Sequence, residues 1–327
     1  MMKASPKLST ATKKKVVDLR GRIAPQSTII AVGAGKGGVG KSFFSSSLAY
    51  FLAQMGHKTL LVDMDLGAAN LHTWLGEGLP SKGINEFMKD TNLTIGELIS
   101  PTMKNNLHLI SGASEGLYNG DISDAEKSRL LSALYNYPTD YIILDLGAGT
   151  HTSTLDYFLM AQHHVVVFTP EPSSIENAYR FMKAVFYRKI RRYGSRLDID
   201  QRIEHITKNN HNIKSPRDLL NTLHKEFPEI SKDLKEVMNQ LQFQIVLNQI
   251  RTAQDRNLGK GIKSVCQRHF GLPCEFLGAL SYDNAVWQSL RQKKHLLVAN
   301  PYSHLYAQIM AMARKLADPS QPKNMVS

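Results

Sequence analysis

Residues 35–42 (GKGGVGKS) restrict what this chain can fold into more than any other segment does. They lie between an apolar run at 28–34, which predicts a strand, and a helix-length stretch at 42–55. Glycines in such a connection let several backbone N–H groups point at one anion, and the following helix directs its positive end at the same place. Lys41 would neutralise charge on the β- and γ-phosphates, and the Ser42 hydroxyl would bind Mg²⁺. The segment therefore predicts a site for the phosphates of a nucleotide.

A second pattern overlaps this one. Residues 33–38 also fit G-x-G-x-x-G, the dinucleotide-binding fingerprint, and Asp63 ends the next predicted strand, where a ribose carboxylate would lie. That interpretation gives no reason for Lys41 and Ser42, or for a second aspartate at Asp65. We therefore favour the triphosphate loop.

Short apolar runs alternate with helix-length stretches along most of the chain. Continuously apolar runs are typical of strands that are covered on both faces. The predicted strands are 28–34, 59–65, 106–111, 140–146, 163–169, 243–249 and 275–280. The predicted helices are 42–55, 123–136, 173–192, 254–269, 283–291 and 302–316. This alternation predicts an α/β fold with a doubly wound, mainly parallel sheet.

The spacing of these elements predicts one domain over 28–316 with an insertion. The stretch 195–241 is too long for a single crossover and is polar, with helix-start signals at Ser215-Pro216 and Phe227-Pro228. We expect two or three short helices there, because structureless loops of that length are uncommon. Residues 1–27 form a predicted basic tail and 317–327 a second tail.

The net charge of +12 is concentrated in two segments. Residues 1–30 carry seven Lys or Arg against one acid, and residues 180–217 carry eleven against three. Such segments favour nucleic acid or an acidic partner, although a solvated helix face gives the same composition. No run of 18 apolar residues occurs, and two cysteines exclude a disulfide framework. We expect a cytoplasmic protein.

One pair of cysteines and one pair of histidines could in principle bind a metal ion, but their spacing gives little support for such a site. Cys266 and Cys274 lack C-x-x-C spacing, so we expect them to be buried as small apolar side chains. His163 and His164 begin an apolar strand, and we expect one of them to face water rather than to bind zinc.

The lysine at position 36 gives the loop the pattern K-G-G-x-G-K-S, which resembles the deviant Walker A motif of MinD/ParA-type P-loop ATPases. Residues 61–71 (LVDMDLGAANL) resemble the second motif and switch I of that family, and 141–149 (YIILDLGAG) resemble its Walker B strand and switch II. Residues 170–179 and 277–283 most resemble the FlhG (FleN) group of flagellar-number regulators. The resemblance covers about 28–185 and 242–316.

The resemblance implies roles for individual residues. The implied catalytic residues are Lys36, which would reach a dimer partner's nucleotide, Lys41, and Asp65, which would position the attacking water. The implied metal-site residues are Ser42, Asp63 and Asp145. The implied nucleotide-binding residues are Gly35, Lys36, Gly37, Gly38, Val39, Gly40, Lys41, Ser42, Phe43, Asn248, Ser281 and Asp283. The chain departs from the family at three positions, where Phe43 replaces Thr or Asn, His72 replaces Asp and Ser281 replaces Pro.

The implied function is an ATP-dependent dimerisation switch that hydrolyses ATP with Mg²⁺ and regulates flagellar placement or number, or cell-pole organisation. A protein partner, such as a flagellar GTPase or a polar factor, would read the dimer and stimulate a slow reaction. Two alternatives stay open at this point: a ParA-like ATPase that binds nucleoid DNA through the basic segments, and a nucleotide-binding scaffold with negligible turnover. Because Pro319 and Pro322 follow the last predicted helix, we do not expect a C-terminal membrane-binding helix.

Overall fold

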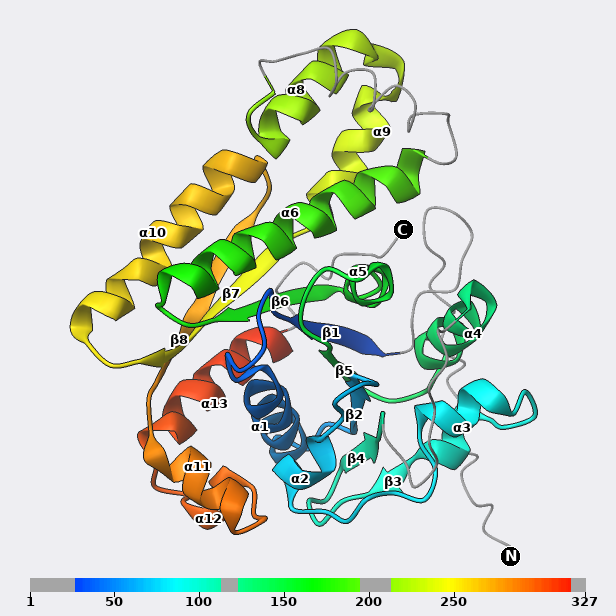
Figure 1. Ribbon diagram of the computed structural model, residues 1–327, viewed down its shortest axis with the longest axis vertical. Helices are drawn as coiled ribbons and strands as arrows, with labels where there is room; N and C mark the ends of the chain where they lie inside the picture. The colour runs from blue at the N-terminus through cyan, green and yellow to red at the C-terminus, as the bar shows by residue number, and fades with distance from the viewer. Residues whose placement is uncertain (1–26, 113–122, 195–212, 319–327) are drawn as a thin grey trace, which may run out of the picture.

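The computed structural model describes residues 27–112, 123–194 and 213–318 (Figure 1). An eight-stranded sheet has the order β3-β4-β2-β5-β1-β6-β7-β8, and every neighbouring pair is parallel except β3 with β4. The strands are β1 (Thr28–Gly33), β2 (Thr59–Met64), β3 (Ser100–Pro101), β4 (Leu107–Ile110), β5 (Tyr141–Leu146), β6 (His163–Phe168), β7 (Phe243–Ile250) and β8 (Cys274–Ser281). The predicted α/β class and mainly parallel sheet are confirmed.

Helices cover both faces of this sheet, α1 and α13 on one side and α5, α6 and α10 on the other (Figure 1). The longer helices are α1 (Lys41–Gln54), α4 (Asp124–Tyr135), α5 (Thr152–Leu159), α6 (Pro172–Gly194), α8 (Pro216–Glu226), α9 (Pro228–Asn239), α10 (Ala253–Phe270), α11 (Asn284–Arg291) and α13 (His304–Ala317). The shorter ones are α2 (Leu71–Leu75), α3 (Ile84–Lys89), the 3₁₀ helix η1 (Ile95–Leu98) and α12 (Leu296–Ala299).

Two apolar cores follow from the period-two geometry of the strands. Along β1, Ile29 and Ala31 belong to the core beneath α5 and α6, whereas Ile30 and Val32 belong to the core beneath α1 and α13. All four side chains are fully buried. Successive strand residues point to opposite faces, so a strand that is covered on both sides must be apolar throughout.

The sequence analysis missed the short elements. The strand β3 has two residues, and α2, α3, η1 and α12 have between four and six. Segments of that length contain too few periodic positions to indicate a structure. The eight-residue α5 was missed as well, because no side chain caps its first turn and it starts with Thr152, Ser153 and Thr154.

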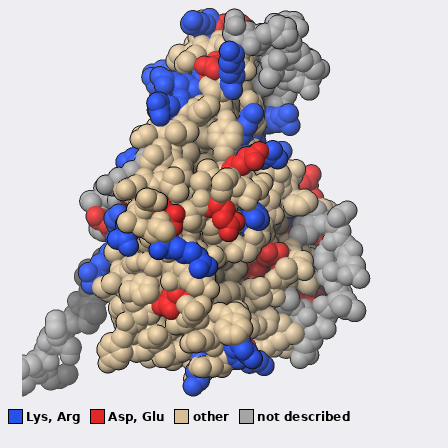
Figure 2. Space-filling view, turned by 60° about the vertical axis from the view of Figure 1, so that its left-hand side comes forward, with Lys and Arg blue, Asp and Glu red and all other residues tan. Residues whose placement is uncertain are grey.

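Two helices of the insertion begin at the prolines that mark helix starts in the sequence. Ser215 accepts a hydrogen bond from the Asp218 N–H and forms a capping box, with Pro216 opening α8. The next helix, α9, opens at Pro228. Both stand beyond α6 and α10 at the upper end of the molecule, where Lys and Arg side chains gather (Figures 1 and 2). Residues 1–26 and 319–327 of the predicted tails, and residues 195–212 of the predicted insertion, lie outside the described residues, whereas α13 extends one residue into the predicted C-terminal tail.

Part of the basic segment is tied to the sheet domain by a buried carboxylate. Asp156 on α5 is 4% exposed and accepts two hydrogen bonds of 2.8 Å from the Arg188 guanidinium. Lys127 lies 3.0 Å from the same carboxylate, and Arg192 lies 3.9 Å away. Arg188 therefore anchors α6 on α5, and the positive charge of the segment is lower at the surface than its composition suggests.

The histidine pair and the two cysteines are buried. His163 and His164 are 6% and 1% exposed, so the expectation that one faces water was wrong. The strand carrying them lies inside the sheet, and β1 and β7 pair with its two edges. Cys266 and Cys274 are free thiols within the apolar core, as expected. Among the described residues, no group of three or more His, Cys, Asp or Glu side chains could hold a metal ion.

Lowering the pH from 7 to 5 should reduce the free energy of unfolding by about 2 kcal/mol through His295 alone. Burial lowers the pKa of His295 to about 4, and its ring stacks on Tyr50 while Nδ1 accepts from the Leu297 N–H. The unfolded chain takes up a proton as the pH falls through about 6.5, whereas the folded protein does not. Stability present above that pH is therefore lost as the pH falls towards 4.

Urea unfolding at pH 7 and pH 5 measures this loss. His295→Asn keeps a residue that caps α12 and should remove about 2 kcal/mol of the pH dependence. The matched variant His108→Asn changes an exposed histidine on β4 and should keep the wild-type difference. Equal pH dependence in the His295→Asn and wild-type proteins would contradict the assignment.

Candidate nucleotide site

The glycine-rich loop connects the end of β1 to the start of α1 at the centre of the sheet (Figure 1). Gly38 and Gly40 have φ angles of 78° and 88°, in the left-handed region that glycine adopts without strain. A Cβ at Gly35 would overlap the backbone carbonyl of Asn177, and one at Gly40 would overlap the Asn248 side chain. The loop therefore needs glycine both for its conformation and for its packing.

Asp145, at the end of β5, joins the loop to the first turn of α1. Its Oδ1 atom lies 3.0 Å from Lys41 Nζ and accepts from Ser45 Oγ at 2.8 Å. Its Oδ2 atom accepts from Ser42 Oγ at 2.6 Å. The carboxylate is 1% exposed, so the protein places a fixed negative charge beside the cationic loop lysine and the Ser42 hydroxyl. A hydroxyl backed by a carboxylate is a donor set that suits Mg²⁺, so these residues fit the ion predicted from the sequence.

Asp63, at the end of β2, shapes the segment that follows it. Its carboxylate accepts from the backbone N–H groups of Asp65, Asn70 and Leu71, at 3.2, 2.9 and 3.0 Å. Burial, and then the charge of Asp145, raise the pKa of Asp63 to about 7. Because both oxygens accept from backbone groups, Asp63 fixes the loop that carries Asp65 and is not open to a ribose hydroxyl. Asp63 therefore cannot serve as the ribose-binding carboxylate that a dinucleotide site would need.

Most of the predicted site residues line one cavity of about 770 Å³. The sequence-predicted residues in its lining are Lys36, Gly37, Gly38, Val39, Gly40, Lys41, Ser42, Phe43, Asp65, Asn248, Ser281 and Asp283. Gly35, Asp63 and Asp145 do not line it, but Asp63 and Asp145 hydrogen-bond to residues that do. Asp65 also lies beside the start of the second switch segment, since a Cβ on Gly147 would be 3.5 Å from Asp65 Oδ1.

The three predicted nucleotide-binding residues outside the loop make hydrogen bonds within the protein. Asn248 Nδ2 donates to the Val39 carbonyl at 2.8 Å. Asp283 caps α11 through the Ala285 N–H, and Ser281 is bonded to Gln308 through both its backbone N–H and its hydroxyl. These side chains therefore build the wall of the cavity, and Asn248 also holds the glycine-rich loop.

An aromatic wall faces the loop, and the sequence analysis did not identify it. Trp74, Tyr282 and Trp287 line the cavity, and Trp287 is 60% exposed. The Arg291 guanidinium lies 4.7 Å from the Trp287 ring centroid, and Phe43 packs against Trp74 with centroids 5.9 Å apart. No motif marks the two tryptophans, and Tyr282 lies within the motif-like segment 277–283 without a role having been assigned to it. The amphipathic helix predicted at 283–291 was the one available signal, and it did not show which face meets the cavity.

Lys36, the second lysine of the loop, contacts the start of α6 and not Asp145. Its Nζ lies 3.6 Å from Glu171 Oε2 and 3.5 Å from Ser173 Oγ, at the start of α6. The Lys36 side chain is 45% exposed and that of Glu171 is 62% exposed. Such an exposed pair is worth about 0–1 kcal/mol, so Lys36 can leave it at little cost.

Comparison with known families agrees with this geometry. Residues 30–297 match the CbiA family, described as the CobQ/CobB/MinD/ParA nucleotide binding domain. The chain therefore belongs to this family of P-loop nucleotide-binding proteins.

Individual relatives include two proteins named for flagellar roles. The chain is 24% identical to the antiactivator FleN of Pseudomonas aeruginosa over 300 residues, which cover 90% of this chain and 88% of FleN. It is 35% identical to the flagellum site-determining protein YlxH of Helicobacter pylori over 161 residues, 47% of this chain. The matched region spans 52% of YlxH, so that likeness concerns about half of the relative.

Solved structures share the fold. The MinD–Mg-ADP complex of Pyrococcus horikoshii matches with a TM-score of 0.59 at 18% identity. The matched region covers 89% of this chain and 96% of the MinD chain. The MinC:MinD complex of Aquifex aeolicus has a TM-score of 0.61 at 18% identity, with 90% and 98% covered. In the part of the chain that the structure describes, no helix is long and apolar enough to cross a membrane.

Proposed function

We propose that this protein is an ATP-dependent dimerisation switch that hydrolyses ATP to ADP and phosphate. The observation that carries the proposal is the joining of Lys41 and Ser42 to the buried Asp145, with Asp65 on the same cavity. The Mg-ADP in the related MinD structure supports the same nucleotide and ion here. A radiometric or phosphate-release assay with Mg-ATP tests it directly, and the absence of turnover with partner present would favour a binding scaffold.

In this proposal each residue has a limited task. The loop N–H groups and Lys41 bind the phosphates, and Ser42 would hold Mg²⁺, which supplies positive charge to the β- and γ-phosphates when bound. Asp65 orients a water whose oxygen forms a bond to the γ-phosphorus while the bond to the β,γ-bridging oxygen breaks. ADP then carries the electron pair of the broken bond.

The position of Lys36 at the edge of the site is the reason for including dimerisation in the proposal. One lysine and one Mg²⁺ already counter phosphate charge from within the subunit, and Lys36 lies half-exposed at its edge. A second copy could receive this cation at its own nucleotide, so that the site is complete only in the dimer. The Lys36–Glu171 pair would be exchanged for that contact.

The biological role that we propose is the regulation of flagellar placement or number. Similarity to FleN over 90% of this chain supports it, and the name of YlxH points the same way. In this role the protein acts in the cytoplasm and meets a protein partner at the inner face of the membrane or the cell pole. Counting flagella by electron microscopy in a deletion strain, with and without the wild-type gene, tests the role separately from ATP hydrolysis.

The DNA-binding alternative has less support. Arg188 is bonded to the buried Asp156, so it is not available to phosphates of a nucleic acid. A DNA-binding mode would depend on exposed residues such as Arg191 and on segments outside the described residues. Steeply salt-dependent DNA binding in the ATP state would favour this alternative.

Nucleotide binding should change the tryptophan fluorescence, because both tryptophans of the chain line the cavity. We expect the purine to lie against Trp287, where an aromatic contact is worth about 0.5–1.5 kcal/mol. Trp287→Ala should therefore weaken Mg-ADP binding about three- to tenfold. Titration followed by fluorescence, and by calorimetry for variants that lack Trp287, measures the effect.

Two control variants distinguish the loss of the aromatic contact at Trp287 from a general loss of folding or stability. Trp287→Phe should keep most of the affinity and lose most of the signal, because it keeps an aromatic face. Tyr302→Ala removes a side chain that is 96% exposed and does not line the cavity, so it should bind as the wild type does. Unchanged affinity in Trp287→Ala would contradict the purine placement.

A further inference from the structure

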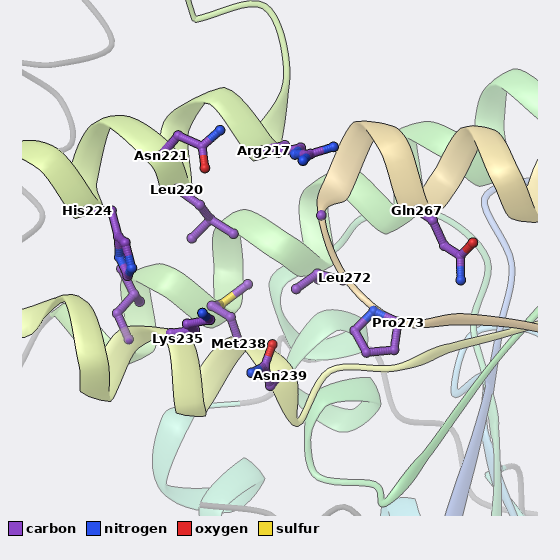
Figure 3. A pocket seen from close by; sticks show the side chains of 12 residues that line it. Arg217, Leu220, Asn221, His224, Lys235, Met238, Asn239, Gln267, Leu272 and Pro273 are labelled. Carbon is purple, nitrogen blue, oxygen red and sulfur yellow. The ribbon is translucent and has the colours of Figure 1, made fainter.

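A second cavity lies where the insertion meets the sheet domain (Figure 3). Its volume is about 610 Å³, and its walls come from α8, α9, the end of α10 and the turn that leads into β8. It shares no lining residue with the nucleotide cavity. Small-molecule sites have volumes of about 300–1,000 Å³, so this cavity is large enough for an organic ligand.

The floor of this cavity is apolar. Leu234, Met238 and Leu272 line it and are 1%, 1% and 4% exposed. Leu220 and Pro273, which are less buried, extend the same apolar lining (Figure 3). A ligand body made of rings or carbon chains would remove this surface from water, which is favourable in proportion to the area covered.

The rim is cationic. Arg217 on α8 and Lys235 on α9 line the cavity together with His224, and no Asp or Glu is among the lining residues. Within the described part of the chain, no carboxylate lies within ion-pair distance of Arg217 or Lys235. The nearest acid along α8, Asp218, accepts hydrogen bonds from the Ser215 N–H and hydroxyl, and it interacts with Arg217 only through the electrostatic field and not as an ion pair.

The turn after α10 contributes to this arrangement. Gly271 ends α10 with φ 65°, and a Cβ there would press on Arg217 Cγ at 3.2 Å. Glycine at this position therefore lets the Arg217 side chain lie against the turn, beside the opening.

We propose that this cavity binds a small organic anion, with an acidic group held by Arg217 and Lys235 and an apolar, ring-bearing body on the Leu234–Met238–Leu272 floor. Charge complementarity selects an anion, and the buried floor selects an apolar body. Because the walls belong to three helices, the ligand would fasten the insertion to the α10–β8 turn. The site is independent of the nucleotide, so the proposal stands apart from the ATPase function.

A matched pair of fluorescent probes tests the charge requirement. The anionic probe is 8-anilinonaphthalene-1-sulfonate, and N-phenyl-1-naphthylamine has the same rings without the sulfonate. Both are titrated into the full-length protein with saturating Mg-ADP, which fills the nucleotide cavity. The sulfonate should bind about tenfold more tightly than the neutral probe, and this preference should fall as salt is raised.

Variants locate the site. Arg217→Glu and Lys235→Glu should each weaken sulfonate binding about tenfold and leave the neutral probe nearly unchanged. Lys232→Glu makes the same change at an exposed position of α9 outside the lining and should bind as the wild type does. Asn221→Trp fills the opening and should abolish binding of both probes. Thermal melting checks that each variant folds.

Three results would overturn the proposal. Equal affinity for the two probes would remove the charge requirement. Unchanged sulfonate binding in both Arg217→Glu and Lys235→Glu, or in Asn221→Trp, would place the probe elsewhere. Displacement of the sulfonate by Mg-ADP would show that it occupies the nucleotide cavity.

Discussion

The Lys36→Ala protein is expected to bind ATP as a monomer but neither to dimerise nor to hydrolyse it. Lys36 Nζ lies beside Glu171 and Ser173 rather than beside Asp145, so its removal leaves the contacts of Lys41 and Ser42 intact. A cation that arrives with a partner stabilises charge only in the closed dimer. In related phosphoryl transfers such cations contribute about 10³–10⁵ in rate, and we expect a loss of that order.

Sedimentation with a non-hydrolysable ATP analogue and Mg²⁺ measures the dimer. Lys36→Arg should recover little activity, because a planar guanidinium fork does not replace a compact ammonium group. Lys183→Ala changes an exposed lysine on α6 and serves as the matched control. Normal dimerisation of Lys36→Ala would refute the action in trans while leaving nucleotide binding untouched.

The Asp65→Ala protein is expected to bind ATP with nearly wild-type affinity and to stay in the dimer, with turnover reduced about 10²–10⁴-fold. Asp65 lines the cavity, and the bonds that hold Lys41 and Ser42 come from Asp145. Binding should therefore survive while the orientation of the attacking water is lost. Phosphate release and sedimentation on the same samples give both quantities.

Lys41→Ala is the informative comparison. It removes the lysine that pairs with the buried Asp145, and it should lose nucleotide affinity rather than trap the dimer. Because it leaves a buried carboxylate without its cation, its stability must be measured alongside. Wild-type turnover by Asp65→Ala would show that another group positions the water.

Seven of the eight strands and the phosphate loop could be predicted from local sequence patterns. Strands that are covered on both faces must be apolar throughout, and the six predicted helix-length stretches correspond to helices that the structure contains. The loop is local as well, since eight consecutive residues carry its glycines, Lys41 and Ser42. The proximity of Asp63 and Asp145 also follows from the predicted fold. Each ends a predicted strand, and the carboxyl ends of parallel strands lie at the same edge of a sheet.

The folded chain shows which predicted surface or binding side chains already form contacts within the protein. In the sequence, Arg188 is one of a cluster of apparently exposed charges. In the structure its guanidinium donates to the buried carboxylate of Asp156, which lies on α5, a helix that the sequence analysis missed. The sequence analysis implied that Asn248 binds the nucleotide, but in the folded chain its Nδ2 donates to the Val39 carbonyl.

The aromatic wall and the second cavity likewise depend on distant segments. Trp74 on α2 and Trp287 on α11 line one cavity, and Arg217 and Lys235 line another only after α8 has packed against both α9 and α10. Periodicity and capping depend on neighbours within one or two turns of chain, so they fix local structure. Contacts between distant segments depend on how whole elements pack, and that physical difference separates what the sequence determined here from what required the fold.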